Sequence, residues 1–145
     1  MKISTKGRYA LRMMIDLAEH YESGLTALKE VSAREEISVK YLEQIVTQLS
    51  KAGLLCSTRG PQGGYRLAKS PDHYTVGDIL RVTEGSLAPV ACLEDTPNLC
   101  ERQGSCVTLE VWEGLYQVME QYVDNIRLSD LVEKKREKAQ YDFSI

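Results

Sequence analysis

Residues 38–53 read SVKYLEQIVTQLSKAG, and this stretch decides the fold. Ser38 offers the hydroxyl of a helix N-cap, and Gly53 is typical of the residue that follows a helix end. The apolar residues between them recur every three or four positions, as on one buried helix face: Leu42, Ile45, Val46 and Leu49. The stretch therefore predicts a helix with one buried side and one exposed side.

A shorter helical stretch precedes this helix, and the two have the spacing of a helix-turn-helix motif. Leu28 and Val31 fall on one face of the shorter stretch. Ser32 is small enough for the two helices to touch, and Ile37 is placed to bury the turn. Glu36 occupies the turn position at which glycine is usual. In this motif the second helix enters the major groove of DNA.

The exposed face of the second helix carries polar groups near its amino end. These residues are Ser38, Lys40, Tyr41, Glu43 and Gln44. An amide such as Gln44 pairs with adenine, and a carboxylate such as Glu43 accepts from the cytosine amino group; each contact gives about 1–3 kcal/mol of discrimination. The face therefore predicts readout of base edges, with an ordinary solvated helix surface as the alternative.

Two short β-strands, expected at residues 54–58 and 65–68, flank the loop RGPQGG at residues 59–64. Glycines on both sides of Pro61 let the backbone approach a groove closely, and Arg59 suits a narrow minor groove. The candidate DNA contacts of this wing are Arg59, Gly60, Gln62 and Gly63. A nucleotide-phosphate loop is disfavoured, because the GxxxxGKS/T spacing is missing and no helix follows.

The remaining elements are also helical. A first helix starts at a Ser4 or Thr5 cap, a capping-box pattern at Thr75 starts another that ends at Gly85, and a last helix is expected from about 129 to 140. The predicted fold class is mainly α: a winged helix-turn-helix DNA-binding domain with a two-stranded wing and a long carboxyl-terminal dimerisation helix. Residues 1–85 form the DNA-binding region, 86–106 a cysteine-rich loop for a metal cluster, and 107–145 the dimerisation helix and a short last helix, in one compact domain.

An apolar seam runs along the predicted long helix in steps of 3, 4, 3, 4 and 3 residues. It consists of Leu109, Trp112, Tyr116, Met119, Val123 and Ile126. Such a seam packs against a partner helix, so we expect a homodimer. Leu115 and Tyr122 widen the stripe enough to cover both the helix's own domain and a second copy. A helix that covers only its own core is the alternative.

Composition excludes several classes of protein. The chain has 145 residues, and its longest apolar run, residues 87–92, is far shorter than the roughly 18 residues of a membrane span. We therefore expect a cytoplasmic protein without membrane contact.

Charge is distributed unevenly along the chain. Residues 1–66 hold ten Lys/Arg against seven Asp/Glu, and residues 67–145 hold eight against fourteen, so positive charge lies in the half expected to meet DNA phosphate. No nucleophile, base and oxyanion donor come together, so an enzyme is not expected.

Three of the four cysteines, Cys92, Cys100 and Cys106, fall within fifteen residues in a region without helical periodicity. A long loop without secondary structure is uncommon in a small domain and usually has a function. Three thiolates are suitable ligands for an iron-sulfur cluster or zinc, so a bound metal group would account for the loop. The fourth ligand is not identified, and Glu110, one turn beyond Cys106, is the first candidate. A thiol sensor without metal is a further possibility. Cys56 stands apart and is expected to be a small buried residue.

Five features in order resemble the IscR family of winged-helix regulators, the Rrf2 family. They are MKISTKGRYALRMMIDLA at 1–18, YLEQIVTQLSKAGLL at 41–55, RGPQGGYRLA at 59–68, TVGDILRVTEG at 75–85 and the three cysteines. The resemblance implies a homodimeric bacterial transcription factor, mostly a repressor of iron-sulfur cluster biogenesis genes. It implies an iron-sulfur cluster in each cysteine loop, with 2Fe-2S favoured over 4Fe-4S. It further implies that Tyr9 touches phosphate, that the second helix of the motif reads the major groove of a palindromic operator and that Arg59 enters the minor groove.

Two positions depart from the family's pattern. The family's cluster histidine corresponds to Leu109, and the position from which some relatives supply a carboxylate corresponds to Arg8. Zinc is kept as the alternative metal, because three thiolates and one further group also complete a tetrahedral site. Two sibling functions stay open: nitric oxide sensing, and regulation of cysteine metabolism with cysteine synthase bound through a carboxyl-terminal isoleucine, here Ile145. A small iron-sulfur electron carrier would explain the cysteines but neither the helix-turn-helix face nor the wing.

Overall fold

The computed structural model describes residues 2–144, with side chains from 2 to 142, so Ile145 lies outside the described residues. The helix-turn-helix and wing consist of α1 (Thr5–Glu19), α2 (Leu28–Glu35), α3 (Val39–Lys51), β1 (Leu55–Thr58) and β2 (Gly64–Leu67). They are followed by α4 (Val76–Glu84), α5 (Leu109–Asp124) and α6 (Leu128–Ser144), with short 3-10 turns at Tyr21–Ser23, Pro71–His73 and Ala91–Leu93. The mainly α winged-helix prediction is confirmed.

α1 is the central helix of the core and contacts α2, α3, α4, α6 and β2. It begins at Ser4, whose hydroxyl accepts a hydrogen bond from the Gly7 N–H. The fully buried apolar residues of α1 and α3 recur every three or four positions along each helix: Ala10, Met13, Met14, Leu17, Leu42, Ile45 and Leu49. The helical spacing of the sequence therefore forms one hydrophobic core.

The wing is an antiparallel hairpin in which Leu55 lies opposite Leu67 and Thr58 opposite Gly64. Both leucines are buried, so the base of the hairpin belongs to the core while its tip projects into solvent. Thr26 and Tyr65 exchange two backbone hydrogen bonds of 2.9 and 2.8 Å. The wing is thereby tied to the segment that leads into α2.

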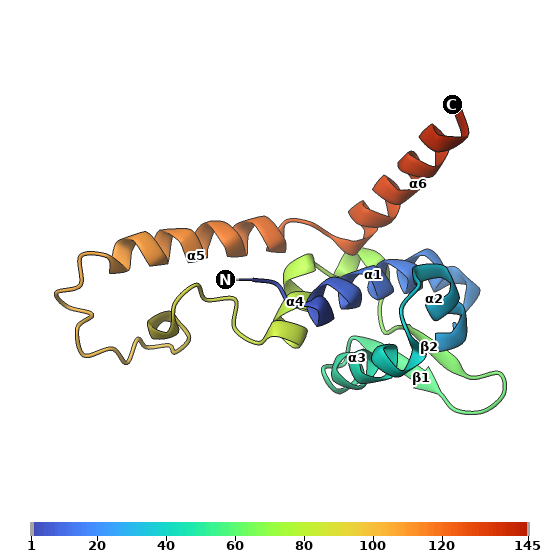
Figure 1. Cartoon of the computed structure of the whole chain (residues 1–145), viewed down its shortest axis with the longest axis horizontal. Coiled ribbons are helices and arrows are strands. Elements are labelled where there is room, and N and C mark those ends of the chain that lie inside the picture. The colour runs from blue at the N-terminus through green and yellow to red at the C-terminus, as the bar shows by residue number, and fades with distance from the viewer. Residues whose placement is uncertain (1, 145) are drawn as a thin grey trace.

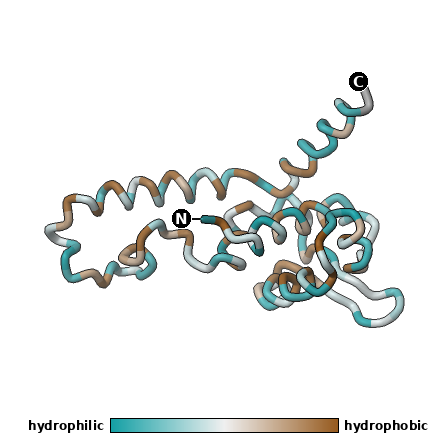
Figure 2. Tube along the Cα trace, viewed as in Figure 1, coloured by the Kyte–Doolittle hydropathy of each residue, from teal (hydrophilic) through white to brown (hydrophobic). Residues whose placement is uncertain are grey.

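α5 runs beside α4 and extends well beyond the helical body, and the cysteine loop lies at its far end (Figure 1). Arg81 of α4 donates two hydrogen bonds, of 2.7 and 2.9 Å, to the carboxylate of Asp124 at the end of α5. Apolar residues recur along the whole length of α5 (Figure 2). Because most of this helix does not touch the body, much of that apolar surface is left open.

Three expectations differ from the structure. α5 ends at Asp124, so Ile126 is not on the helix as predicted; its carbonyl accepts from the Val76 N–H at 2.9 Å, and this pairing turns the chain toward α6. α6 is longer than expected and reaches Ser144. Cys56 is exposed, because only Leu55 of β1 is buried and the strand leaves the core from Cys56 onward.

Within the described residues, the helices are too short or too polar to span a membrane.

Candidate nucleic-acid interface and cysteine loop

The turn between α2 and α3 is built from three local interactions. Glu36 has φ of 56°, the left-handed conformation that usually favours glycine. The Ser32 hydroxyl donates to the Ile37 carbonyl at 2.6 Å, and the Ser38 hydroxyl accepts from the Tyr41 N–H at 3.2 Å. Together these interactions fix the angle at which α3 leaves the turn, as a helix-turn-helix requires.

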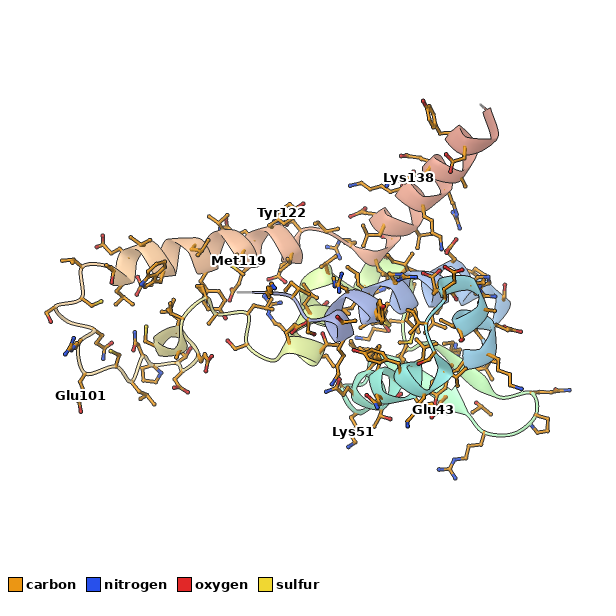
Figure 3. The ribbon with its side chains drawn as sticks, viewed as in Figure 1. Glu43, Lys51, Glu101, Met119, Tyr122 and Lys138 are labelled. Atoms are coloured by element: carbon orange, nitrogen blue, oxygen red, sulfur yellow. The ribbon has the colours of Figure 1, made fainter. Side chains whose placement is uncertain are left out.

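The amino half of α3 presents the predicted recognition residues to solvent. Ser38, Lys40, Glu43 and Gln44 are exposed, whereas Tyr41 is half-buried. Glu43 lies on the side of the molecule away from α5 and α6, which is also the side of the wing (Figures 1 and 3). The helix and the wing therefore share one face that a DNA duplex could approach.

Tyr41 and Tyr9 join the recognition helix to α1. Their rings pack edge to face, with centroids 5.4 Å apart and an interplanar angle of 76°. The Arg12 guanidinium lies 5.4 Å from the Tyr9 ring centroid and also hydrogen-bonds the backbone carbonyl and the carboxylate of Glu35. Arg12 thus holds the carboxyl end of α2, next to the turn, and it was not among the predicted site residues.

An ion pair between a buried carboxylate and a partly exposed guanidinium provides a second link between α1 and α2. Asp16 is completely buried, and Arg34 donates two hydrogen bonds of 2.8 Å to its carboxylate. The hydrogen bonds and the negative charge of the Asp16 carboxylate raise the pKa of the Arg34 guanidinium. Asp16 is a polar residue among the apolar positions of the first helix, which is a sequence signal for a buried charge. The sequence does not show that its partner is Arg34, eighteen residues away on another helix.

The wing tip is a tight turn closed by a hydrogen bond of 2.9 Å from the Gly63 N–H to the Gly60 carbonyl. A Cβ on Gly63 would lie 2.0 Å from the Thr58 carbonyl oxygen, so no other residue fits without opening the turn. Arg59, Gly60 and Gln62 are exposed at the tip. The structure therefore presents the predicted wing contacts together, on the same side as α3.

The cysteine loop connects α4 to α5. Cys92 lies in the short 3-10 turn, Cys100 follows the only cis peptide of the described chain, Thr96–Pro97, and Cys106 precedes α5. All three thiols are half-buried and free. Cys106 shares a hydrogen bond of 3.4 Å with the Thr108 hydroxyl, which lowers the pKa of its thiol.

Three soft thiol donors on one loop match the ligand chemistry of iron-sulfur clusters and zinc. In the part of the chain that the structure describes, however, no three His, Cys, Asp or Glu side chains converge as a metal site. Glu110 and Cys106 line the same hollow at the start of α5, while Cys92 and Cys100 lie outside it. The donor set therefore fits a metal group, and the loop would have to gather the three thiols around it.

Most of the predicted apolar seam packs against the chain's own body, and a different apolar stripe of α5 faces outward. Tyr116, Val123 and Ile126 pack against the α4 side of the body, and Met119 lies in a hollow beside Ile3. The remaining seam residues, Leu109 and Trp112, are half-buried. A neighbouring stripe faces outward: Val111, Val118 and Tyr122 are 58–67% exposed, and Leu115 lies among them. Figure 3 shows Tyr122 on the side of α5 away from the body.

Known proteins are similar to this chain in both sequence and fold. Residues 3–134 match the Rrf2 family, described as an iron-dependent transcriptional regulator. The HTH-type transcriptional regulator CymR of Bacillus subtilis is 43% identical over 131 residues, 90% of this chain and 89% of that protein. The HTH-type transcriptional regulator IscR of Aliivibrio salmonicida is 38% identical over 132 residues, 91% of this chain and 77% of that protein.

Solved structures agree with the sequence comparison. IscR of T. potens matches with a TM-score of 0.76 and 40% identity, over 95% of this chain and 90% of that one. CymR of B. subtilis, a global cysteine regulator, matches with a TM-score of 0.76 and 42% identity, over 92% of this chain and 98% of that one. These relatives are transcriptional regulators and not enzymes. The helix-turn-helix, the wing and this family match together show that the chain belongs to the Rrf2 family of DNA-binding transcriptional regulators.

Proposed function

We propose that the chain is a homodimeric repressor of iron-sulfur cluster biogenesis genes whose DNA affinity depends on a metal cluster held by Cys92, Cys100 and Cys106. The single observation that carries the DNA-binding part is the shared face of α3 and the wing, on which exposed polar side chains accompany an exposed arginine. The three thiols and the family's description as iron-dependent support the sensing part.

The outward stripe of α5 supports dimerisation. It joins Val111, Leu115, Val118 and Tyr122 along one side of a helix that is about 24 Å long. An apolar stripe of this length is typical of an interface between subunits. The stripe lies beside the predicted seam, so the same helix would pack on its own α4 with one side and on a second copy with the other.

The direction of that pairing follows from where the body lies. α3 and the wing lie on one side of α5 (Figure 1). A twofold axis parallel to α5 would turn the second body to the opposite side, and the two recognition helices would face away from each other. Among the axes perpendicular to α5, the one that runs from α5 toward α3 keeps both recognition helices on one side, as half-sites about 34–36 Å apart require. We therefore propose that the two α5 helices pair antiparallel.

DNA contact is proposed for the residues already named on α1, α3 and the wing. Tyr9, at the amino half of α1, would meet a phosphate, because its half-buried ring packs against Tyr41 of the recognition helix. Gln44 and Glu43 would read base edges, and Arg59 would lie in the minor groove. The wing's glycines would let its backbone follow the groove wall.

Operator selection from a random duplex pool, followed by binding measurements, tests this interface. Gln44→Ala should lose discrimination at one base pair of the selected site, and Arg59→Ala should weaken binding to every sequence. Gln117→Ala, at an exposed position of α5, is the matched control and should bind as the wild type does. Wild-type affinity in both test variants would refute the proposed contacts.

The cysteine loop would act on DNA binding through α5. A metal group bound there supplies redox and ligand-exchange chemistry. Cys92, Cys100 and Cys106 would hold it, with Glu110 as the proposed fourth ligand, and a 2Fe-2S cluster is preferred to 4Fe-4S or zinc. Because the loop joins α4 to α5, drawing the thiols together would restrict the start of the dimer helix and so the spacing of the two recognition helices.

Anaerobic purification followed by iron, sulfide and zinc analysis tests the loop. Iron and sulfide in equal amounts, lost in a Cys92→Ala, Cys100→Ala and Cys106→Ala variant, are expected. Equal operator affinity of that variant and the wild type, before and after reconstitution, would remove the sensing role. Zinc without sulfide in the purified protein would show that the loop binds zinc and not an iron-sulfur cluster.

The similarity to CymR favours one second candidate, regulation of cysteine metabolism, because that relative is a global cysteine regulator and is 43% identical. This candidate predicts a metal-free protein that binds promoters of cysteine genes. It also predicts capture of cysteine synthase from solution. Purified cysteine synthase passed over the immobilised full chain, with and without Ile145, distinguishes the two candidates.

A further inference from the structure

We propose that Glu35, the last residue of α2, is a positioning residue that connects α6 to the recognition helix α3. Its carboxylate contacts Arg12 of α1 and Lys135 of α6, so the turn before α3 depends on the position of α6. The inference rests on the proposed reading of base edges by α3. It adds a residue that acts on DNA recognition through its neighbours and not through contact with DNA.

The carboxyl end of α2 is held by charged groups from two other helices. Arg12 of α1 donates to the Glu35 carboxylate at 3.4 Å and also to the Glu35 backbone carbonyl. The Lys135 ammonium of α6 lies 3.6 Å from the other oxygen of the same carboxylate. Because the Glu35 side chain is only 13% exposed, solvent and salt screen these contacts less than they would at an open surface.

α2 depends on support from other helices because it is short. It has eight residues, and Ala27 at its start has no side-chain group that could cap it. Glu35 is followed directly by Glu36, whose left-handed backbone begins the turn into α3. A shift at Glu35 therefore changes the direction in which α3 leaves the turn.

A series of contacts leads from Glu35 to the amino half of α3. The Arg12 guanidinium lies 5.4 Å from the centroid of the Tyr9 ring, and Tyr9 packs edge to face against Tyr41. Tyr41 lies three residues before Gln44 on the recognition helix. Glu35 thus orients Arg12, and Arg12 in turn supports the aromatic pair that packs beneath the proposed base-reading residues.

α6 connects this arrangement to the rest of the molecule. It packs on α1 and on the 3-10 turn Pro71–His73, and residues 125–127 join it to the end of α5. α6 and α3 lie on opposite sides of α1 (Figure 1). A displacement of α5 that moved α6 would therefore change the ion pair between Lys135 and Glu35, and with it the orientation of α3.

A second carboxylate distinguishes this role from simple attachment of α6 to the body. Lys135 also pairs with Glu19 of α1, and this pair, at 2.5 Å, is shorter than the pair with Glu35 at 3.6 Å. If Lys135 only attached α6 to the body, Glu19 would be the more important partner. If Lys135 positions the recognition helix, Glu35 is the more important partner, because it belongs to α2.

Operator discrimination is the readout that a merely structural role does not change. It is the ratio of the affinity for the selected operator to the affinity for a scrambled duplex at one salt concentration, so the sequence-independent attraction to phosphate cancels. Glu35→Gln keeps the shape of the side chain but removes its charge, and it should lower this ratio about fivefold. Lys135→Met should lower the ratio about threefold, whereas Lys135→Arg, which keeps the charge, should retain it. Because Lys135 is 45% exposed, Lys135→Met should fold even if Glu35→Gln does not.

Two variants are matched controls. Glu19→Gln makes the same exchange at the other partner of Lys135, and Lys134→Met makes the same exchange at the neighbouring exposed lysine of α6. Both should keep the wild-type ratio, although Glu19→Gln should lower the midpoint of urea unfolding. In a double variant, the effects of Glu35→Gln and Lys135→Met on the ratio should be less than additive, because both remove one contact.

Three outcomes would contradict these expectations. Equal losses of discrimination in Glu19→Gln and Glu35→Gln would overturn the proposal, because the ion pairs would then act only through stability. A wild-type ratio in Lys135→Met would also overturn it, since α6 would then have no part in positioning α3. A wild-type protein that selects no operator from the random pool would refute the proposed base reading by α3, and with it the role of Glu35.

Discussion

Glu36, at the turn of the helix-turn-helix, has a backbone conformation that is unfavourable for a residue other than glycine. It is the only residue other than glycine with positive φ in the described chain. The left-handed conformation costs an ordinary side chain about 1–2 kcal/mol, because Cβ crowds the following carbonyl. Its side chain is exposed, and nothing in the structure explains why glutamate rather than glycine occupies the position.

Replacing Glu36 with glycine should therefore stabilise the protein. We expect Glu36→Gly to raise the free energy of unfolding by about 1 kcal/mol, measured by urea denaturation. Glu43→Gly is the matched control, since it makes the same exchange inside a helix and should lower that free energy by about 1 kcal/mol. Destabilisation by both variants would show that the Glu36 side chain makes a favourable interaction.

Among the elements, the wing has a tip whose shape depends on local backbone packing and a base that belongs to the core. A Cβ on Gly63 would clash with the backbone at Thr58, whereas Leu55 and Leu67 at the hairpin's base are buried far from the tip. A substitution that distorts the tip should therefore leave the rest of the fold intact. Such a substitution changes the shape of the wing tip without a large change in the stability of the domain.

Gly63→Ala should weaken operator binding by more than about tenfold, because the turn must open to admit the methyl group and Arg59 is displaced. The melting temperature should fall by only a few degrees. Gly114→Ala on α5 is the control, because the structure shows open space at that Cβ position and operator binding should not change. Unchanged binding by Gly63→Ala would mean that the wing does not contact DNA.

The contact between α4 and α5 is sensitive to acid. The hydrogen bonds from Arg81 lower the pKa of the Asp124 carboxyl below its ordinary value of 3.8. The pair therefore stabilises the fold fully above that ordinary pKa and loses its contribution as the pH falls through the lowered one. Because both side chains are 35–40% exposed, the contribution stays below about 1 kcal/mol.

Asp124→Asn should accordingly be less stable than the wild type at neutral pH, with the gap closing below about pH 4. Urea unfolding from pH 3 to pH 8 measures this difference. Asp142→Asn, at an exposed position near the end of α6, should show no such pH-dependent gap. A gap that persisted unchanged at pH 3 would contradict the assignment to this ion pair.

For the whole molecule, the proposed dimer depends on the outward stripe of α5, through which the two recognition helices would act together. Val118→Asp places a charge at the centre of the stripe and should convert the dimer into a folded monomer, seen by sedimentation velocity. Operator affinity should fall at least a hundredfold, because one recognition helix then binds alone. Gln117→Asp, one residue away on the opposite side of the helix, should stay dimeric. A dimeric Val118→Asp protein would place the interface elsewhere.

Sequence reasoning predicted the local parts of this protein well. Periodic apolar residues identified α3, cap residues located Ser4, Ser38 and Thr75 at helix starts, and glycines around Pro61 predicted the wing. These features depend on neighbours a few residues apart, which a sequence lists directly. The family resemblance rested on the same local stretches and is confirmed.

Local sequence patterns were enough to predict the winged helix-turn-helix, its exposed polar face and the presence of three thiols on one loop. Packing between distant elements set which side of α5 stays open, the pairing of Ile126 with Val76, and the contacts by which Arg12 and Arg34 link α1 to α2. The physical reason is range: periodicity reports that a residue is buried, but the partner of a buried or charged group is chosen by how distant helices pack.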